Sequence, residues 1–388
     1  MADTTTRTIL DADSHIMELA DFLDPFIDDA HRDRLKRHRM AAMEPVLDRA
    51  MEKAEERRAD PAKAAVAEER LWIDKGWSAM GAFDADERSR VLDLMGYQGQ
   101  LVFATFASAL YAGRDLDRVY AGSSAQNRAL ADFCSSDDRM LPVGYVPLDD
   151  PARAVALATE AIEAGCAAVM VPSTAAGDRA PTHPDLDGFW DLLAESDTPF
   201  VLHVGGGGKL LDRAFHNNDM PVTDHLGGGE NVRSKDFLAI DASPSLFLGV
   251  LVYDGLFDRF PKLRGGCIEQ GAGWVVSWLH KLEFGLRSFR RTEAPLTRLQ
   301  MTPTEYVQKH LKFTPYPGEP VGWMIEQAGR ELFMFSSDYP HPEGTKNPME
   351  RFEATLTGIS DADQDLFYAG NMAQLLGSKA PALVHASS

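Results

Sequence analysis

Acidic and histidine side chains occur at the ends of apolar stretches that lie far apart in the chain. Asp11, Asp13 and His15 alternate along the first such stretch, His203 ends a second, and Asp338 follows a third. On an extended backbone, side chains two residues apart project to the same side, so one strand can present a pair of ligands to a single cation. Imidazole and carboxylate groups are common ligands of divalent metals in proteins. The spacing predicts a metal site assembled from several strands.

These side chains need a scaffold that brings distant strand ends together. From residue 84 onwards, helix-like and strand-like stretches alternate: helices are predicted at 85–95, 117–135, 151–164, 187–195, 255–260 and 273–284, and strands at 101–104, 141–147, 167–172, 199–204, 264–269 and 332–336. Such alternation predicts a parallel sheet covered by helices. The length favours closure into a (β/α)8 TIM barrel, whose chemistry lies at the C-terminal ends of the strands.

We expect residues 1–388 to form one barrel domain with two additions. Residues of about 30–75 are rich in Ala, Arg, Glu and Met at helical spacing, interrupted at Asp60-Pro61, which predicts a helical insertion after the first strand. This insertion is either a lid, a dimer surface or a solvated hairpin. Helices are also expected at about 360–377. The glycine-containing segment Lys209–Lys235 is predicted to be a flexible lid.

Composition limits the classes of partner. The net charge is −20 and the pI is about 4.9, so a nucleic-acid partner is not expected. The sequence has neither a signal-like start nor an apparent membrane-spanning run, which predicts a soluble cytoplasmic protein. Cys134, Cys166 and Cys267 form no CxxC pair and are expected to be buried thiols. We expect a small-molecule substrate and a homodimer.

Four motifs in order resemble a known enzyme family. They are Asp-x-Asp-Ser-His at the first strand, Leu-His-Val, Ile-Glu-x-Gly-x-Gly-Trp, and Ser-Ser-Asp-Tyr-Pro-His. Together they resemble the amidohydrolase superfamily, in its amidohydrolase-2 branch with aminocarboxymuconate-semialdehyde decarboxylase and related aromatic-acid decarboxylases. The resemblance extends from about Ile9 to Leu376. It implies a divalent cation held by Asp13, His15, His203 and Asp338.

Two departures from the family pattern affect the metal and the chemistry. Asp13 stands where the family usually has His, and the added oxygen ligand favours manganese, iron or zinc with retained waters. Glu269 stands where the decarboxylases carry a catalytic His, and we expect it to act as a general base or to bind the metal. With Asp11 and Asp338 the pocket then has four carboxylates. One ion is expected, and a dinuclear centre is the alternative.

A cation in this site polarises a carbonyl group and lowers the pKa of bound water. We expect hydrolysis of an ester, lactone or amide bond in a small, hydrophobic carboxylate or cyclic substrate, with Asp338, Glu269 and His203 as the catalytic residues. Glu269 supports this reading, because an anionic side chain is a poor proton donor for decarboxylation. The alternatives are non-oxidative decarboxylation of an aromatic or enol acid and, third, a non-heme iron or diiron oxygenase on the same scaffold.

Three further residues are expected to contact substrate. His341 follows Asp338 by three residues, and it either reaches the site or belongs to a plain loop. His183 is placed after the strand at 167–172 and is expected to face the pocket. Trp274 lies one helical turn before Trp278, so it either lines the pocket or packs in the core.

Overall fold

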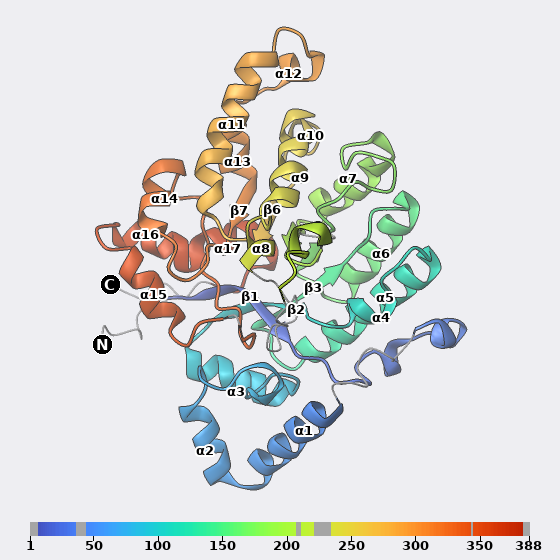
Figure 1. Cartoon of the computed structure of the whole chain (residues 1–388), viewed down its shortest axis with the longest axis vertical. Helices are drawn as coiled ribbons and strands as arrows, with labels where there is room; N and C mark the ends of the chain where they lie inside the picture. The colour runs from blue at the N-terminus through green and yellow to red at the C-terminus, as the bar shows by residue number, and fades with distance from the viewer. Residues whose placement is uncertain (1–6, 36–43, 207–210, 221–233, 343, 383–388) are drawn as a thin grey trace.

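The computed structural model contains seven parallel strands whose order in the sheet follows the chain (Figure 1). The structure describes residues 7–35, 44–206, 211–220, 234–342 and 344–382. Each strand hydrogen-bonds to the next one in sequence, as in a singly wound barrel. The strands are β1 (Leu10–Ile16), β2 (Gly99–Ala104), β3 (Met140–Tyr145), β4 (Ala168–Met170), β5 (Phe200–His203), β6 (Gly265–Ile268) and β7 (Leu311–Phe313).

The segment 332–339 occupies the position of an eighth strand. On one side the Phe313 N–H donates to the Leu332 carbonyl at 2.8 Å. On the other side the Ala12 N–H donates to the Phe335 carbonyl at 3.0 Å. The segment therefore joins β7 to β1 and closes the ring, which confirms the predicted TIM-barrel class.

Helices follow the strands and cover the outside of the sheet (Figure 1). These helices are α3 (Ala85–Met95), α4 (Ser108–Tyr111), α5 (Leu116–Cys134), α6 (Pro151–Glu163), α7 (Asp187–Glu195), α8 (Ser234–Phe237), α9 (Ala242–Tyr253), α10 (Leu256–Arg259), α11 (Gly273–Phe289), α12 (Ala294–Arg298), α13 (Pro303–His310), α14 (Val321–Ala328), α15 (Pro348–Thr355), α16 (Asp361–Asp365) and α17 (Asn371–Leu376). Two of them, α3 and α7, begin and end where the sequence predicts. A π-helical turn over Leu366–Gly370 joins α16 to α17.

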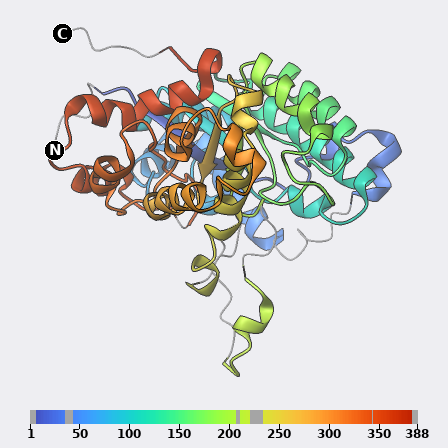
Figure 2. The same cartoon turned by 90° about the horizontal axis from the view of Figure 1, so that it is seen from above.

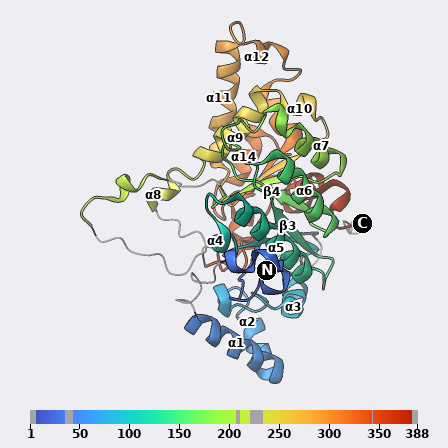
Figure 3. The same cartoon turned by 90° about the vertical axis from the view of Figure 1, so that its right-hand side faces the viewer.

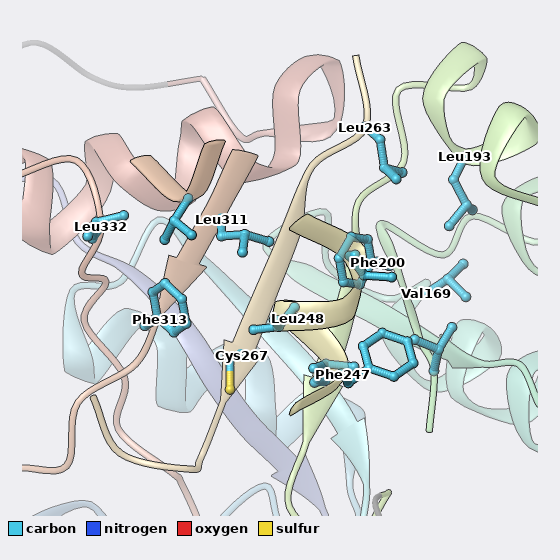
Figure 4. Close-up of a cluster of buried hydrophobic side chains, with 14 of the residues drawn as sticks. Val169, Leu193, Phe200, Phe247, Leu248, Leu263, Cys267, Leu311, Phe313 and Leu332 are labelled. Carbon is cyan, nitrogen blue, oxygen red and sulfur yellow. The ribbon is translucent and has the colours of Figure 1, made fainter. Parts of the chain in front are cut away.

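Two of the clusters of buried apolar side chains in the described residues lie on the two faces of the sheet. One lies between the sheet and its helices, where Phe200 and Phe313 on the strands meet Phe247 and Leu248 of α9 (Figure 4). The other lies inside the barrel and includes residues of β1, β2, β5, β6 and α17. Because Leu375 of α17 accepts a hydrogen bond from Arg264, which precedes β6, α17 covers the N-terminal end of the barrel. The functional side chains must therefore enter from the opposite end.

An insertion between β1 and β2 carries two helices outside the barrel. It contains α1 (Glu44–Ala59) and α2 (Pro61–Glu69), and Asp60 caps α2 by accepting the Ala62 N–H. Arg57 of α1 forms a buried ion pair with Glu87 of α3, with two nitrogen–oxygen distances of 2.7 Å. This bidentate contact fixes the insertion against α3.

Residues 211–220, which lie between β5 and α9 in the chain, project away from the barrel (Figures 2 and 3). Most of the predicted lid Lys209–Lys235 lies outside the described residues. By length and composition alone, Ser234–Tyr253 is apolar enough to cross a membrane. In the structure this stretch is divided into α8 and α9, and α9 packs into the core with Phe247, Leu251 and Val252 buried. A buried core helix accounts for its composition.

Candidate metal centre

Six side chains meet inside the barrel at its C-terminal end. Asp13 and His15 come from β1, His203 is the last residue of β5, and Glu269 follows β6 directly. Asp338 and His341 follow the eighth strand-like segment. They form two overlapping groups, in each of which all the ligand atoms lie within 4.8 Å of one another. Asp13, His15, His203 and Glu269 make the first group, and His15, Glu269, Asp338 and His341 make the second.

The atoms of the first group surround one small volume. His15 Nε2 lies 3.3 Å from Asp13 Oδ1 and 3.7 Å from Glu269 Oε2. His203 Nε2 lies 3.4 Å from the same Asp13 oxygen and 3.2 Å from the same Glu269 oxygen. Two imidazole nitrogens and two carboxylate oxygens thus alternate around a common centre.

The second group adds two residues from the C-terminal part of the chain, Asp338 and His341. His15 Nε2 lies 3.8 Å from Asp338 Oδ1, and His341 Nδ1 lies 3.0 Å from that same oxygen. The His15 and His341 rings stack with their centroids 3.7 Å apart. His341 therefore belongs to the cluster rather than to a plain loop.

The expectation that Asp11 faces this site is wrong. The pairing register of β1 with β2 shifts between Asp11 and Ser14, and such a bulge breaks the simple alternation of side chains. Asp11 instead accepts hydrogen bonds from the Ser337 N–H at 2.8 Å and from the Gln100 side chain at 2.7 Å. Asp11 thereby connects β1 to β2 and to the segment 332–339, and it belongs to neither ligand group. The cluster therefore contains three carboxylates and not four.

Burial raises the pKa of Asp11 to about 7, although the hydrogen bonds from Ser337 and Gln100 act in the opposite direction. At Asp13 burial also raises the pKa, but hydrogen bonds and charges from His15 and His203 outweigh it, so its pKa lies below the usual range. The two carboxyl groups have opposite shifts because only Asp13 has imidazole neighbours.

Burial, followed by the charge of His341, holds the pKa of His15 well below its usual value. A neutral imidazole has a lone pair to donate, and an ionised Asp13 is a good oxygen ligand. Both protonation states are those that a metal ion requires of its ligands.

Glu269 and Asp338 share an unusual backbone conformation. Each has φ +54°, a left-handed value that is uncommon for residues other than glycine. The Tyr316 hydroxyl donates to the Glu269 carbonyl at 2.9 Å, and the Asp338 N–H donates to the Asp13 carbonyl at 2.9 Å. These bonds hold the two carboxylates at the ends of their strands, where backbone strain often accompanies function.

The donor set fits a divalent cation. Metal bonds of about 2.0–2.2 Å place neighbouring ligand atoms roughly 3.0–3.5 Å apart. The four nitrogen–oxygen distances of the first group, 3.2–3.7 Å, come close to this range. Imidazole together with carboxylate suits zinc, manganese or iron.

The two other predicted substrate contacts lie elsewhere or serve the fold. His183 begins the short 3-10 helix Pro184–Leu186, where its ring accepts the Asp185 N–H and its side chain is 43% exposed. The structure places it in neither ligand group. Trp274 packs against Phe313 and donates its indole N–H to the Gly271 carbonyl at 3.0 Å. It contacts the loop that follows Glu269 and, being partly buried, packs against the core.

Two polar residues next to the cluster were not predicted. Thr105 directly follows β2, and its hydroxyl lies within hydrogen-bonding distance of both His15 and His341. Glu18 is buried and accepts backbone N–H groups of the same loop. Thr105 could have been found by the same signal as His203, because each is a polar side chain at the C-terminal end of a strand. Glu18 had no such signal, because it follows β1 by two residues.

Comparison of the sequence with models of protein families assigns the chain to a family. The model of the Amidohydrolase family, Amidohydro_2, matches residues 11–378. The chain belongs to this amidohydrolase family. The resemblance in the four motifs is thereby confirmed. No curated protein sequence matches this amidohydrolase.

Solved structures show the same fold at low sequence identity. An amidohydrolase from Mycobacterium avium subsp. paratuberculosis is 20% identical, with a TM-score of 0.72, and the match covers 96% of this chain and 99% of that one. A 5-carboxyvanillate decarboxylase from Novosphingobium aromaticivorans, with bound manganese, is 16% identical with a TM-score of 0.64, covering 97% and 99%. A dihydroxybenzoic acid decarboxylase from Polaromonas sp., with manganese and 2-nitroresorcinol, is 17% identical with a TM-score of 0.62, covering 96% and 97%.

Family membership and the buried cluster confirm two predictions for this amidohydrolase. It is an enzyme of the metal-dependent hydrolase or decarboxylase class. It also has a buried group of His, Asp and Glu side chains able to hold a metal ion, and decarboxylases of the same fold bind manganese. The reaction and the role of each residue are proposals.

Proposed function

We propose that this amidohydrolase removes the carboxylate of a hydroxylated aromatic acid without an oxidant. The observation that carries the proposal is the convergence of Asp13, His15, His203 and Asp338 at one barrel end, beside a buried imidazole. Structural neighbours that hold manganese with aromatic ligands are decarboxylases, which favours this reaction over the hydrolysis expected from the sequence. A divalent ion there would bind the substrate oxygens and withdraw electron density.

The chain's own residues would orient the substrate and move one proton. Decarboxylation breaks the bond between ring and carboxylate, forms a ring C–H bond with one proton, and releases carbon dioxide. His341 Nδ1 lies 3.0 Å from Asp338 Oδ1, so this pair can hold a proton at the edge of the cluster. It would take over the proton transfer that the family assigns to the His at the position of Glu269.

Glu269 favours hydrolysis as a second candidate. Its Oε2 atom lies 3.2 Å from His203 Nε2, inside the ligand group, where a carboxylate can accept a proton from an attacking water. Ester, lactone and amide substrates are the class expected for this reaction. A Glu269→Gln variant separates the two reactions, because Gln keeps the shape and removes the base. We expect it to abolish hydrolysis and to slow decarboxylation less.

The overlap of the two ligand groups favours a dinuclear centre as a third candidate. Glu269 belongs to both groups, and a carboxylate has two oxygens with which to bridge two ions. Three imidazoles and two further carboxylates lie beside Glu269 and suit iron; a diiron centre would supply dioxygen activation and, with a two-electron reductant, hydroxylation of the substrate. Metal analysis separates this candidate, since it requires two iron ions per chain.

One experiment tests the proposed reaction against both alternatives. The purified enzyme, loaded with Mn²⁺, is incubated with a panel of hydroxybenzoates and, separately, with aryl esters and lactones, and carbon dioxide release is measured. An iron-loaded sample is assayed for dioxygen uptake in the presence of a chemical reductant. We expect carbon dioxide from at least one hydroxybenzoate and none from the His203→Ala variant. Ester hydrolysis or dioxygen uptake without carbon dioxide release would overturn the proposal.

A further inference from the structure

Thr105 contacts two imidazoles of the cluster and one backbone carbonyl. Its Oγ1 atom lies 2.8 Å from the Ile16 carbonyl, 2.9 Å from His341 Nε2 and 3.3 Å from His15 Nδ1. Both rings are fully buried. One hydroxyl group therefore links the strand that carries His15 to the loop that carries His341.

The chemistry of the three contacts fixes where the protons lie. A hydroxyl has one proton to donate and two lone pairs that accept. The Ile16 carbonyl can only accept, so the Thr105 proton goes to it. The two ring nitrogens must then donate to Thr105 Oγ1, which places a proton on His15 Nδ1 and another on His341 Nε2.

The opposite nitrogen of each neutral ring then carries a lone pair that faces the cluster. His15 Nε2 faces Asp13 Oδ1 at 3.3 Å, and His341 Nδ1 faces Asp338 Oδ1 at 3.0 Å. A lone pair beside a carboxylate oxygen is repulsive unless a cation or a proton lies between them. We propose that Thr105 is a positioning residue that sets the tautomers of His15 and His341, so that His15 presents a metal-binding nitrogen and His341 Nδ1 can receive the proton that it shares with Asp338.

His203 offers an independent comparison within the same cluster. Its Nδ1 atom lies 2.9 Å from the Val204 carbonyl, which can only accept, so the proton is on Nδ1 and the lone pair is on Nε2. All three imidazoles thus direct an unprotonated nitrogen at the carboxylates. His203 uses a backbone carbonyl of its own strand end, whereas His15 and His341 share Thr105.

A buried carboxylate holds Thr105 in place. Glu18 accepts the N–H of Thr105 at 2.9 Å, that of Phe106 at 3.0 Å and that of Ala107 at 3.1 Å. Three successive backbone donors on one carboxylate fix the loop after β2. Because Glu18 follows β1, the loop is tied to the strand that carries His15, and these bonds fix the position of Thr105 relative to that strand.

The inference rests on the metal centre of the proposed function and not on the reaction assigned to it. Groups that orient metal-binding imidazoles typically contribute about 10–100-fold to metal affinity. Thr105→Val removes the hydroxyl at constant shape, and Thr105→Ser restores it. Thr159→Val is a matched control, because Thr159 donates only to the Val155 carbonyl within α6.

Two measurements test the role of Thr105. The Mn²⁺ dissociation constant is measured by titration, and the protonation of the ring nitrogens by ¹⁵N spectra of histidine-labelled, metal-free protein. We expect Thr105→Val to weaken Mn²⁺ binding about 10–100-fold and to change the ¹⁵N pattern of His15 and His341, with Thr105→Ser within about threefold of wild type. Unchanged binding and spectra in Thr105→Val would overturn the inference.

The design keeps the two proposals separate. If Thr105→Val does not fold, Thr105→Ala replaces it with the same expected outcome. If the wild type binds Mn²⁺ but releases no carbon dioxide, only the reaction is wrong. If the wild type binds no Mn²⁺, the proposed function fails, and the ¹⁵N spectra alone decide the tautomers.

Discussion

The same strands contribute to an apolar core at one end of this barrel and to a buried polar cluster at the other. At the closed end, Leu10 of β1 and Val201 of β5 pack with Leu375 of α17 in an apolar core. A few residues further along the same strands, His15 and His203 reach the buried polar cluster. In TIM barrels the C-terminal face carries chemistry and the N-terminal face carries stability. The comparison predicts that substitutions at the two ends have separable effects.

The largest effect is expected at the open end. Asp338→Asn keeps the size of the side chain and removes its charge, so it weakens metal binding and abolishes proton transfer. We expect activity to fall about 1,000-fold, within the range of a positioned acid–base group, with an unchanged free energy of unfolding. Steady-state kinetics and urea unfolding measure the two quantities. Asp191→Asn, on an exposed position of α7, is the control, and full turnover in Asp338→Asn would refute the assigned role.

The converse effect is expected at the closed end. Leu375 is fully buried in α17, and Leu375→Ala leaves a cavity beneath the barrel. We expect a loss of about 3 kcal/mol in the free energy of unfolding, with Mn²⁺ affinity within twofold of wild type. Leu246→Ala is the control, because Leu246 is 70% exposed and should cost less than about 0.5 kcal/mol. A large loss of metal affinity in Leu375→Ala would show that the two ends are coupled.

The smallest effect concerns a buried lysine on β7. Burial lowers the pKa of Lys312 to about 8 from 10.5, so below pH 8 the folded state carries a poorly solvated charge. Between pH 8 and 10.5 the folded state loses this proton before the unfolded state does, and wild-type stability rises relative to a variant without the group. We expect the difference in free energy of unfolding between Lys312→Met and wild type to shrink by about 2–3 kcal/mol as the pH rises across this range.

Urea unfolding of both proteins at pH 7, 8, 9 and 10 measures this change. Lys281→Met is the matched control, because Lys281 lies exposed on α11. Its difference from wild type should not vary with pH. A Lys312→Met difference that is constant between pH 8 and 10 would show that Lys312 has an ordinary pKa in the folded protein.

The sequence predicted the barrel because most strands are continuous apolar runs followed by amphipathic helices. It missed α9, which is mostly apolar and has no helical periodicity, and β7, whose apolar run is interrupted by Lys312. Packing in the closed barrel determines both elements. A local sequence pattern cannot show this, because the neighbours of α9 and β7 are distant in the chain.

The convergence of the side chains could be predicted where a residue's position on its strand was sufficient. Asp13, His15, His203, Glu269 and Asp338 all lie in the cluster, because parallel strands align their C-terminal ends. Asp11 was misplaced because alternation was assumed to continue through the bulge of β1.

Thr105 and Glu18 were missed for a different reason. Thr105 acts by a hydrogen bond to two rings that are distant in the chain, and Glu18 acts by bonds to the loop after β2. Thr105 carried a position signal, because it directly follows β2, but the contacts that it and Glu18 make depend on the folded geometry and are not visible in a sequence pattern.

The central claim is that the open end of the barrel binds a divalent ion, and His15 tests it most directly because it belongs to both ligand groups. Equilibrium dialysis with Mn²⁺ counts the ions bound by the wild type and by His15→Ala. The account predicts at least one tightly bound equivalent in the wild type and a loss of about 100-fold or more in affinity in the variant. A wild type that binds no Mn²⁺, or a variant that binds it equally well, would contradict the account.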